Sequence, residues 1–246
     1  MKMNLRPAFR YQFGSSLRSA VIILLIILAI FVFLAVGTFY IAVGAVEMRF
    51  TGYSISFAIF LFVMGIVGVR SDMRLCLQCG VSRRTAFVSG FLATLCLSFV
   101  LALSLELLTA LVQLWMRADY HFFSADLYQI LYLSGSQARL TAGQHVISVL
   151  VNTSTLFASG LLGNFFSLLY WRLNKALTVL VSLAFPVLPS AVSWLMYRIG
   201  VNLKPFIDWV AVSPFNFVLS FMLGGIVCAG INWLLLRRAD IRSAAA

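Results

Sequence analysis

Charged residues are scarce in this sequence. They account for 10% of its 246 residues, whereas 62% are hydrophobic, and the mean hydropathy is +1.02. Soluble domains carry about 25% charged residues, so this composition excludes one and is typical of an integral membrane protein. The sequence also lacks a clear linker or internal repeat. We therefore expect one all-α membrane domain over residues 1–246.

Histidine and glutamate are too few for the common membrane-enzyme sites. Ser159 lies beside a glycine in "FASGLLG", but a serine nucleophile needs a histidine base, and we expect His145 to lie about four turns away. The only glutamates, Glu47 and Glu106, each stand alone. We expect no catalytic residue, and helix packing through small residues is the better explanation of this stretch.

The sequence also has few residues suited to a metal site, a disulfide or nucleotide hydrolysis. Cys76 and Cys79 have zinc-like spacing, but a structural zinc site needs four ligands, and the two histidines belong to the opposite predicted side. Cys96 and Cys228 fall inside apolar runs, so we expect no disulfide. The sequence has no G-x-x-x-x-G-K-[ST] phosphate loop, so this chain cannot supply ATP hydrolysis. We expect no metal and no cofactor in the chain itself.

Long apolar runs dominate the sequence. A helix needs about 20 apolar residues to cross the roughly 30 Å hydrocarbon core, and we find six candidate runs: residues 20–46, 53–69, 85–115, 146–171, 176–197 and 215–236. The first is much longer than a signal h-region and ends without a clear cleavage site, so we expect it to be retained. Pro186 and Pro189 predict that the fifth span bends or breaks.

Two stretches outside the spans are also rich in apolar residues. Residues 116–145 form a long external segment in which "FFSADLYQILYL" has helical spacing and is expected on the outer surface. Residues 198–214 contain an apolar stretch that is too short to cross. They either dip into the outer leaflet as a re-entrant segment or rest at the interface with Trp209 as an anchor.

Positive charge gathers on one predicted side of the membrane. That side accounts for the whole net charge of +11 and carries Lys2, Arg6, Arg10, Arg18, Arg70, Arg74, Arg83, Arg84, Arg172, Lys175, Arg237, Arg238 and Arg242. Cytoplasmic loops keep an excess of Lys and Arg, so we expect both termini in the cytoplasm of a multi-pass cell-membrane protein, typically of the bacterial plasma membrane. These charges flank spans instead of forming one patch, which argues against a nucleic-acid partner.

The segment before the first span has an amphipathic pattern. Apolar and aromatic side chains recur every four residues beside a stripe of arginines: Leu5, Arg6, Phe9, Arg10, Phe13 and Leu17. Residues 1–19 are therefore expected to form an interfacial elbow helix, with Gly14 permitting a bend into the first span. The alternative is a frayed basic tail that serves only topology.

A short basic stretch, "SDMRLCLQCGVSRRTAF", interrupts the apolar sequence between the second and third runs. Ser71 is expected to cap a helix of about two turns, and Gly80 to end it in the left-handed conformation. Ser82 is then expected to cap the helix that continues into span three. Such a short helix needs a surface to dock against, so it is either a topological anchor in the headgroups or a handle gripped by a cytoplasmic protein.

Within that stretch, "CGVSRRTAF" resembles the cytoplasmic-loop segment of ABC type-2 exporter permeases. The amphipathic elbow, the proline-containing sequence between spans five and six and the ending "LLLRRADIR" agree with this resemblance. It implies that two permeases pair, as homodimer or heterodimer, with two ATP-binding-cassette subunits that bind ATP and Mg²⁺. The implied ATPase-coupling residues are Asp72, Met73, Arg74, Leu75, Cys76, Leu77, Gln78, Cys79, Gly80, Ser82, Arg83 and Arg84. The long external segment departs from the family pattern.

Several polar residues fall inside the apolar runs. Glu106 has either an interfacial packing role or a contact with substrate or protons, since intramembrane acids are costly. Asn152, Asn164, Asn216 and Asn232 are candidates for interhelical hydrogen bonds. The resemblance implies an exporter permease, and an apolar path with few charges is compatible with an amphipathic or hydrophobic substrate such as a peptide, lipid or drug. The alternatives are a substrate-capture subunit of an ATP-driven uptake system and a sensor or immunity protein that transports nothing.

Overall fold

The computed structural model describes residues 5–41, 48–115, 122–133, 140–184, 187–199 and 204–237, and this description is confined to them. Its helices are α1 (Leu5–Ile41), α2 (Tyr53–Gln78), α3 (Arg83–Trp115), α4 (Leu127–Tyr132), α5 (Ala142–Arg172), α6 (Lys175–Ala184), α7 (Leu188–Arg198), α8 (Lys204–Val212) and α9 (Pro214–Arg237). Two short strands complete it, β1 (Met48–Thr51) and β2 (Phe122–Ala125).

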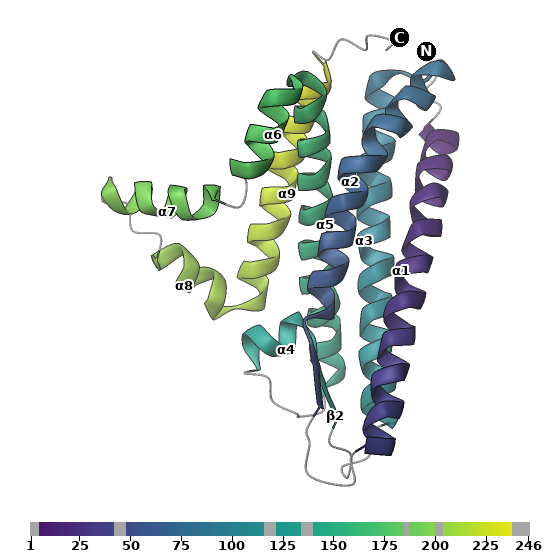
Figure 1. The fold of residues 1–246 in the computed structure, drawn as a ribbon, viewed down its shortest axis with the longest axis vertical. Coiled ribbons are helices and arrows are strands. Elements are labelled where there is room, and N and C mark those ends of the chain that lie inside the picture. The colour runs from purple at the N-terminus through teal and green to yellow at the C-terminus, as the bar shows by residue number, and fades with distance from the viewer. Residues whose placement is uncertain are drawn as a thin grey trace.

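Five of the described helices are long and apolar enough to cross a membrane: α1, α2, α3, α5 and α9. They stand side by side as a bundle (Figure 1). Large apolar side chains such as Phe33, 77% exposed, and Val67, 66% exposed, point outward, while Asn152, Ser89 and other polar residues are buried. A chain surrounded by lipid gains little from burying leucine and must pair its polar groups internally. The prediction of an all-helical membrane protein is confirmed.

The long helices run in two opposed sets. Helices α1 and α3 descend in Figure 1, whereas α2, α5 and α9 ascend. Val151 on α5 clusters with Phe217 on α9, and Leu168 clusters with Leu236, so later residues of α5 meet later residues of α9. We call the end with Leu5, the α2–α3 turn and Arg237 the basic end. The opposite end, with β1 and β2, is the strand end.

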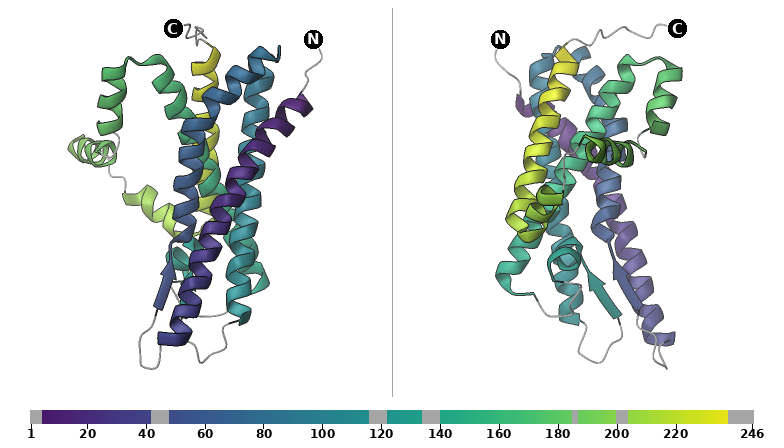
Figure 2. Two further views of the ribbon diagram at one scale, coloured as in Figure 1. Left: turned by 45° about the vertical axis from the view of Figure 1, so that its right-hand side comes forward. Right: turned by 90° about the vertical axis from the view of Figure 1, so that its left-hand side faces the viewer.

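The segment predicted as a fifth span, residues 176–197, is not one helix. It is divided between α6, of 10 residues, and α7, of 11 residues, and neither is long enough to cross. Because α5 and α9 point the same way, the chain between them must travel back, and α6, α7 and α8 make that return in pieces (Figure 2). Helix α6 ends at Ala184 and α7 begins at Leu188, which agrees with the predicted bend or break, and Pro186 lies outside the described residues.

Glycines bring α2 and α5 into backbone contact. A Cβ on Gly65 would lie 2.6 Å from the carbonyl oxygen of Gly160, and a Cβ on Gly163 would overlap the carbonyl oxygen of Phe62. Ser159 donates a hydrogen bond of 2.6 Å to the Ala58 carbonyl across the same contact. We call this contact the glycine seam. Small residues and side-chain hydrogen bonds are the usual means of joining helices within a bilayer.

The predicted elbow is not a separate helix. A single helix, α1, runs from Leu5 to Ile41, so residues 5–17 continue directly into the first span. Gly14 is helical, and a bend there is not needed because Gln12 anchors this part of α1 to α3. The Gln12 side chain accepts a hydrogen bond from Ser89 at 2.7 Å and donates one to the Ala86 carbonyl at 3.5 Å. The arginines of the segment, Arg6, Arg10 and Arg18, are exposed.

The strand end holds structure that the sequence did not predict. Strands β1 and β2 form a parallel pair in which Met48 lies opposite Phe122 and Thr51 opposite Ala125. Helix α4 follows and packs against α5 through buried Tyr128, so the helical spacing predicted for this stretch forms a short helix held against the bundle. Residues 116–121 and 134–139 of the predicted loop, residues 200–203 of the predicted re-entrant segment and the tail after Arg237 lie outside the described residues.

Candidate functional site

The turn between α2 and α3 is compact and fully hydrogen-bonded. Gly80 has φ of 74°, the Val81 amide donates to the Cys76 carbonyl at 2.9 Å, and the Gly80 amide donates to Leu77 at 3.0 Å. This is a Schellman motif, in which a left-handed glycine closes a helix. The Ser82 hydroxyl then accepts from the Thr85 amide at 3.2 Å and caps α3. The predicted roles of Gly80 and Ser82 are confirmed.

The predicted separate coupling helix is absent from this turn. Helix α2 is continuous from Tyr53 to Gln78, so residues 73–78 are its last turns and Cys79 is its C-cap. Ser71 is not an N-cap, because it lies within that helix and donates its hydroxyl hydrogen to the Gly68 carbonyl at 2.8 Å. The good helix formers around Ser71 let the chain continue where a capping residue alone suggested a start.

The inner side of the turn is fixed to the rest of the bundle. Met73 and Cys76 on α2 and Ala86 on α3 are buried in one cluster with residues of α1, α5 and α9, among them Leu168 and Leu236. The Arg172 side chain at the end of α5 donates a hydrogen bond of 2.8 Å to the Leu235 carbonyl of α9. Displacement of the turn would therefore act on the ends of three other helices, α1, α5 and α9, at once.

The outer side of the turn is accessible. The exposed residues there include Gln78, Cys79, Gly80, Ser82 and Arg84, and Leu75 is 39% exposed. Arg74, Leu77 and Arg83 are half-buried. The sequence-predicted coupling residues thus divide into an outward set that a partner could touch and an inward set, Met73 and Cys76, that holds the turn in place. Asp72 belongs to neither, because it lines a cavity.

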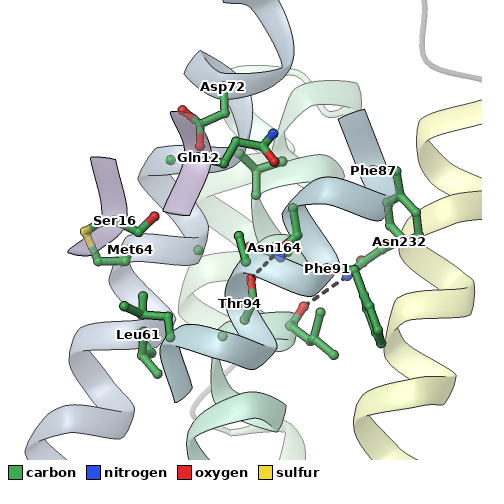
Figure 3. A pocket seen from close by; sticks show the side chains of 18 of the residues that line it. Gln12, Ser16, Leu61, Met64, Asp72, Phe87, Phe91, Thr94, Asn164 and Asn232 are labelled. Atoms are coloured by element: carbon green, nitrogen blue, oxygen red, sulfur yellow. Dashed lines mark hydrogen bonds between the residues drawn. The ribbon is translucent and has the colours of Figure 1, made fainter. Parts of the chain in front are cut away.

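That cavity, of about 80 Å³, lies among α1, α2, α3, α5 and α9. Figure 3 shows Asp72 and Gln12 at its upper end, Leu61 at its lower end, and Asn164 and Asn232 between them. Asn232 is 1% exposed, and its amide donates a hydrogen bond of 3.1 Å to the Leu161 carbonyl. The amide oxygen of Asn232 has no partner among the described residues.

Glu106 lies in a hydrogen-bonded group near the strand end. Its two carboxylate oxygens contact His145 Nδ1 at 2.5 Å and the Ser148 hydroxyl at 2.6 Å, both on α5. The Glu106 side chain is 8% exposed and that of His145 is 27% exposed, so the pair lies at the edge of the buried region. This arrangement joins α3 to α5 and agrees with the interfacial packing role considered for Glu106.

A second carboxylate, Asp126, is buried nearby at 1% exposed. It caps α4, its oxygens accept hydrogen bonds from Ser54 on α2 and Asn152 on α5, and its amide donates to the Gln129 side chain at 3.0 Å. Burial raises the pKa of Asp126 above its ordinary value of 3.8, although the hydrogen bonds from Ser54 and Asn152 act in the opposite direction. The residue therefore ties the external segment to two spans.

Of the asparagines proposed as hydrogen-bond formers, three make such bonds in the described structure. Asn152 donates to Asp126, Asn232 to Leu161, and Asn216 to the Trp209 carbonyl at 2.8 Å. The sequence reasoning missed Gln12 and Asp126. The D-x-x-Q spacing of Asp126 and Gln129 is a capping-box signal that could have located the start of α4.

Comparison with protein-family models, with curated proteins and with solved structures finds no match to this chain.

Proposed function

We propose that this protein is the membrane-spanning permease subunit of an ATP-binding-cassette exporter, with the α2–α3 turn as the contact for a separate ATPase. The observation that carries the proposal is the construction of that turn. Its outer side is exposed and basic, and its inner side is packed among the ends of α1, α5 and α9. A force applied by a partner would be passed to the bundle, as rocking of packed helices requires.

The path of the chain supports the same proposal. The return from α5 to α9 through α6, α7 and α8 brings Arg237 to the same end of the bundle as Leu5 and the turn (Figure 1). Six passes, one of them broken, would place both ends on the cytoplasmic side with the described arginines at the basic end. An ATPase in the cytoplasm would then face the turn directly.

The test is a mild-detergent pull-down of the tagged full-length protein from its host, followed by mass spectrometry of bound proteins. We expect a soluble subunit with a phosphate loop, and at least a tenfold lower recovery when Arg83→Glu and Arg84→Glu are combined, because charge reversal places two carboxylates on the contact surface. Arg6→Glu with Arg10→Glu is the matched control, since it reverses two exposed charges at the same end of the bundle, on α1 instead of in the turn.

A second readout uses Cys79, which is exposed, whereas Cys76 and Cys228 are buried; Cys96 is half-buried and is replaced by serine for this measurement. Maleimide labelling of Cys79 should slow at least tenfold when the ATPase is bound. Recovery of the chain alone, or of a partner that is indifferent to the Arg83 and Arg84 changes, would refute the coupling role and favour a sensor or immunity protein.

A further inference from the structure

The side chains that line the cavity beside Asp72 favour one chemical class of ligand. The preference for that ligand does not depend on the proposed ATPase contact. Asp72 is the one acidic residue among the described residues that line it, and none of those is Lys, Arg or His. Asp72 is half-buried, and a carboxylate partly shielded from water is stabilised by a positive charge close by. The lining supplies none, so a cation would have to come from the ligand.

The side chain of Asn232 is a second, independent indication that the cavity binds a hydrogen-bond donor. The amide oxygen of Asn232 is buried without a hydrogen-bond donor among the described residues, while its amide nitrogen is committed to the Leu161 carbonyl. Buried polar atoms in native proteins are almost always paired, and an unpaired one marks a place for water, an ion or a ligand. The Asn232 oxygen therefore lacks a hydrogen-bond donor, and the Asp72 carboxylate in the same cavity is an acceptor only. A primary ammonium carries three donors and no acceptor, so it complements both groups.

The shape of the cavity limits the rest of the ligand. Its volume of about 80 Å³ is far below the roughly 300–1,000 Å³ of sites for drug-sized molecules. It is also elongated, because Leu61 and Asp72 are separated by three turns of α2, about 16 Å at 1.5 Å per residue. The end away from Asp72 is lined by Leu61, Leu97 and Phe91, so a narrow apolar chain suits it better than water.

We propose that this cavity binds a single-chain alkylammonium, with the ammonium group at Asp72 and the alkyl chain along Leu61 and Leu97. Glycines leave the space for it. A Cβ on Gly68 would meet only an Asp72 carboxylate oxygen, at 3.9 Å, and a Cβ on Gly90 would meet only Gln12, at 3.6 Å and beyond. A larger side chain at either position would enter the cavity instead of striking the backbone.

The test is saturation binding of radiolabelled n-octylamine to the full chain in lipid nanodiscs, without ATPase. We expect saturable binding at one site per chain, competed at least tenfold better by unlabelled octylamine than by octan-1-ol or octanoate. Asp72→Asn, which preserves the shape of the side chain, should weaken binding at least tenfold. Gly68→Leu should weaken it by at least as much by filling the space.

Gly224→Leu is the matched control, because nothing lies within 4 Å of a Cβ at Gly224 and that residue does not line the cavity. It should bind as the parent does. Uptake that matches empty nanodiscs would mean that octylamine only partitions into lipid and that water fills the cavity, and it would overturn the proposal. Equal binding by the parent, Asp72→Asn and Gly68→Leu would overturn it as well. If the proposed ATPase contact proved wrong, the expected octylamine binding of the parent and of each variant would stay the same.

Discussion

Replacement of Gly163 by leucine is expected to abolish the native packing of α2 against α5. A Cβ at this position would overlap the Phe62 carbonyl oxygen and lie 3.1 Å from the Gly65 Cα, and neither backbone can move without moving its whole helix. Overpacking of a core usually costs about 1–3 kcal/mol, and obstruction by backbone places this case above that range. We expect a fall of about 10 °C or more in the unfolding midpoint, measured by size-exclusion chromatography after heating in detergent.

Gly224→Leu again provides the comparison. Gly224 is exposed on α9 and has open space around it, so the same change in side chain meets no obstacle. Leucine is a better helix former than glycine by roughly 0.8 kcal/mol, so this variant should be as stable as the parent or slightly more so. If Gly163→Leu behaved like Gly224→Leu, the two helices would not meet at the glycine seam.

Asp126→Ala is expected to destabilise the protein by about 4 kcal/mol. The change removes the N-cap of α4 and leaves the buried donors of Ser54 and Asn152 without an acceptor. A lost cap costs about 1 kcal/mol and each unpaired buried donor about 1–3 kcal/mol. Denaturant unfolding of the purified protein, followed by circular dichroism, measures the loss.

Asp126→Asn separates the hydrogen bonds of this residue from its charge. Its amide oxygen can still cap α4, and rotation of the Asn152 amide would present the now unpartnered Asn152 oxygen to the new amide nitrogen. We therefore expect a loss of less than about 1 kcal/mol. A loss as large as that of Asp126→Ala would show that the negative charge itself, and not the hydrogen bonds, holds the segment.

The parent protein and Asp126→Asn also test how stability depends on pH. Burial raises the pKa of Asp126 above 3.8, so the folded state binds this proton more readily than the unfolded state does. Its contribution to stability is therefore complete below about pH 4 and is lost as the pH rises through the raised pKa. The difference in unfolding midpoint between parent and Asp126→Asn should shift against the parent as the pH rises. A constant difference would contradict the raised pKa.

The sequence predicted the spans because they depend on local composition. Apolar runs mark α2, α3, α5 and α9 to within a few residues at most ends, and Gly80 and Ser82 marked the α2–α3 turn. Prediction from the sequence failed where contacts between distant residues decide whether a helix continues. Ser71 looks like a cap in isolation, but the neighbouring residues favour helix, and Met73 and Cys76 find a buried surface as the same helix continues. Residues 5–17 likewise join α1 because Gln12 meets Ser89, a contact between distant positions.

Only part of the candidate site could be predicted from the sequence. The outward residues of the turn followed from the basic interruption between two apolar runs. The cavity did not, because its polar groups come from α1, α2, α3, α5 and α9 and no spacing along the chain connects them. The glycine seam was missed for a related reason. Gly65 and Gly160 lie far apart in the sequence, and only the parallel course of α2 and α5 (Figure 1) brings them together.

The parallel pairing of β1 with β2 sets an order of events during biosynthesis. Strand β1 follows α1 and strand β2 follows α3, and Met48 pairs with Phe122, so β1 is made long before its partner. The pair can close only after α2 and α3 have both been inserted, which delivers the two strands to the same end. A chain with either helix misinserted would leave an unpaired strand edge, which invites aggregation. The small ladder can therefore form only in a chain whose first three long helices are correctly threaded.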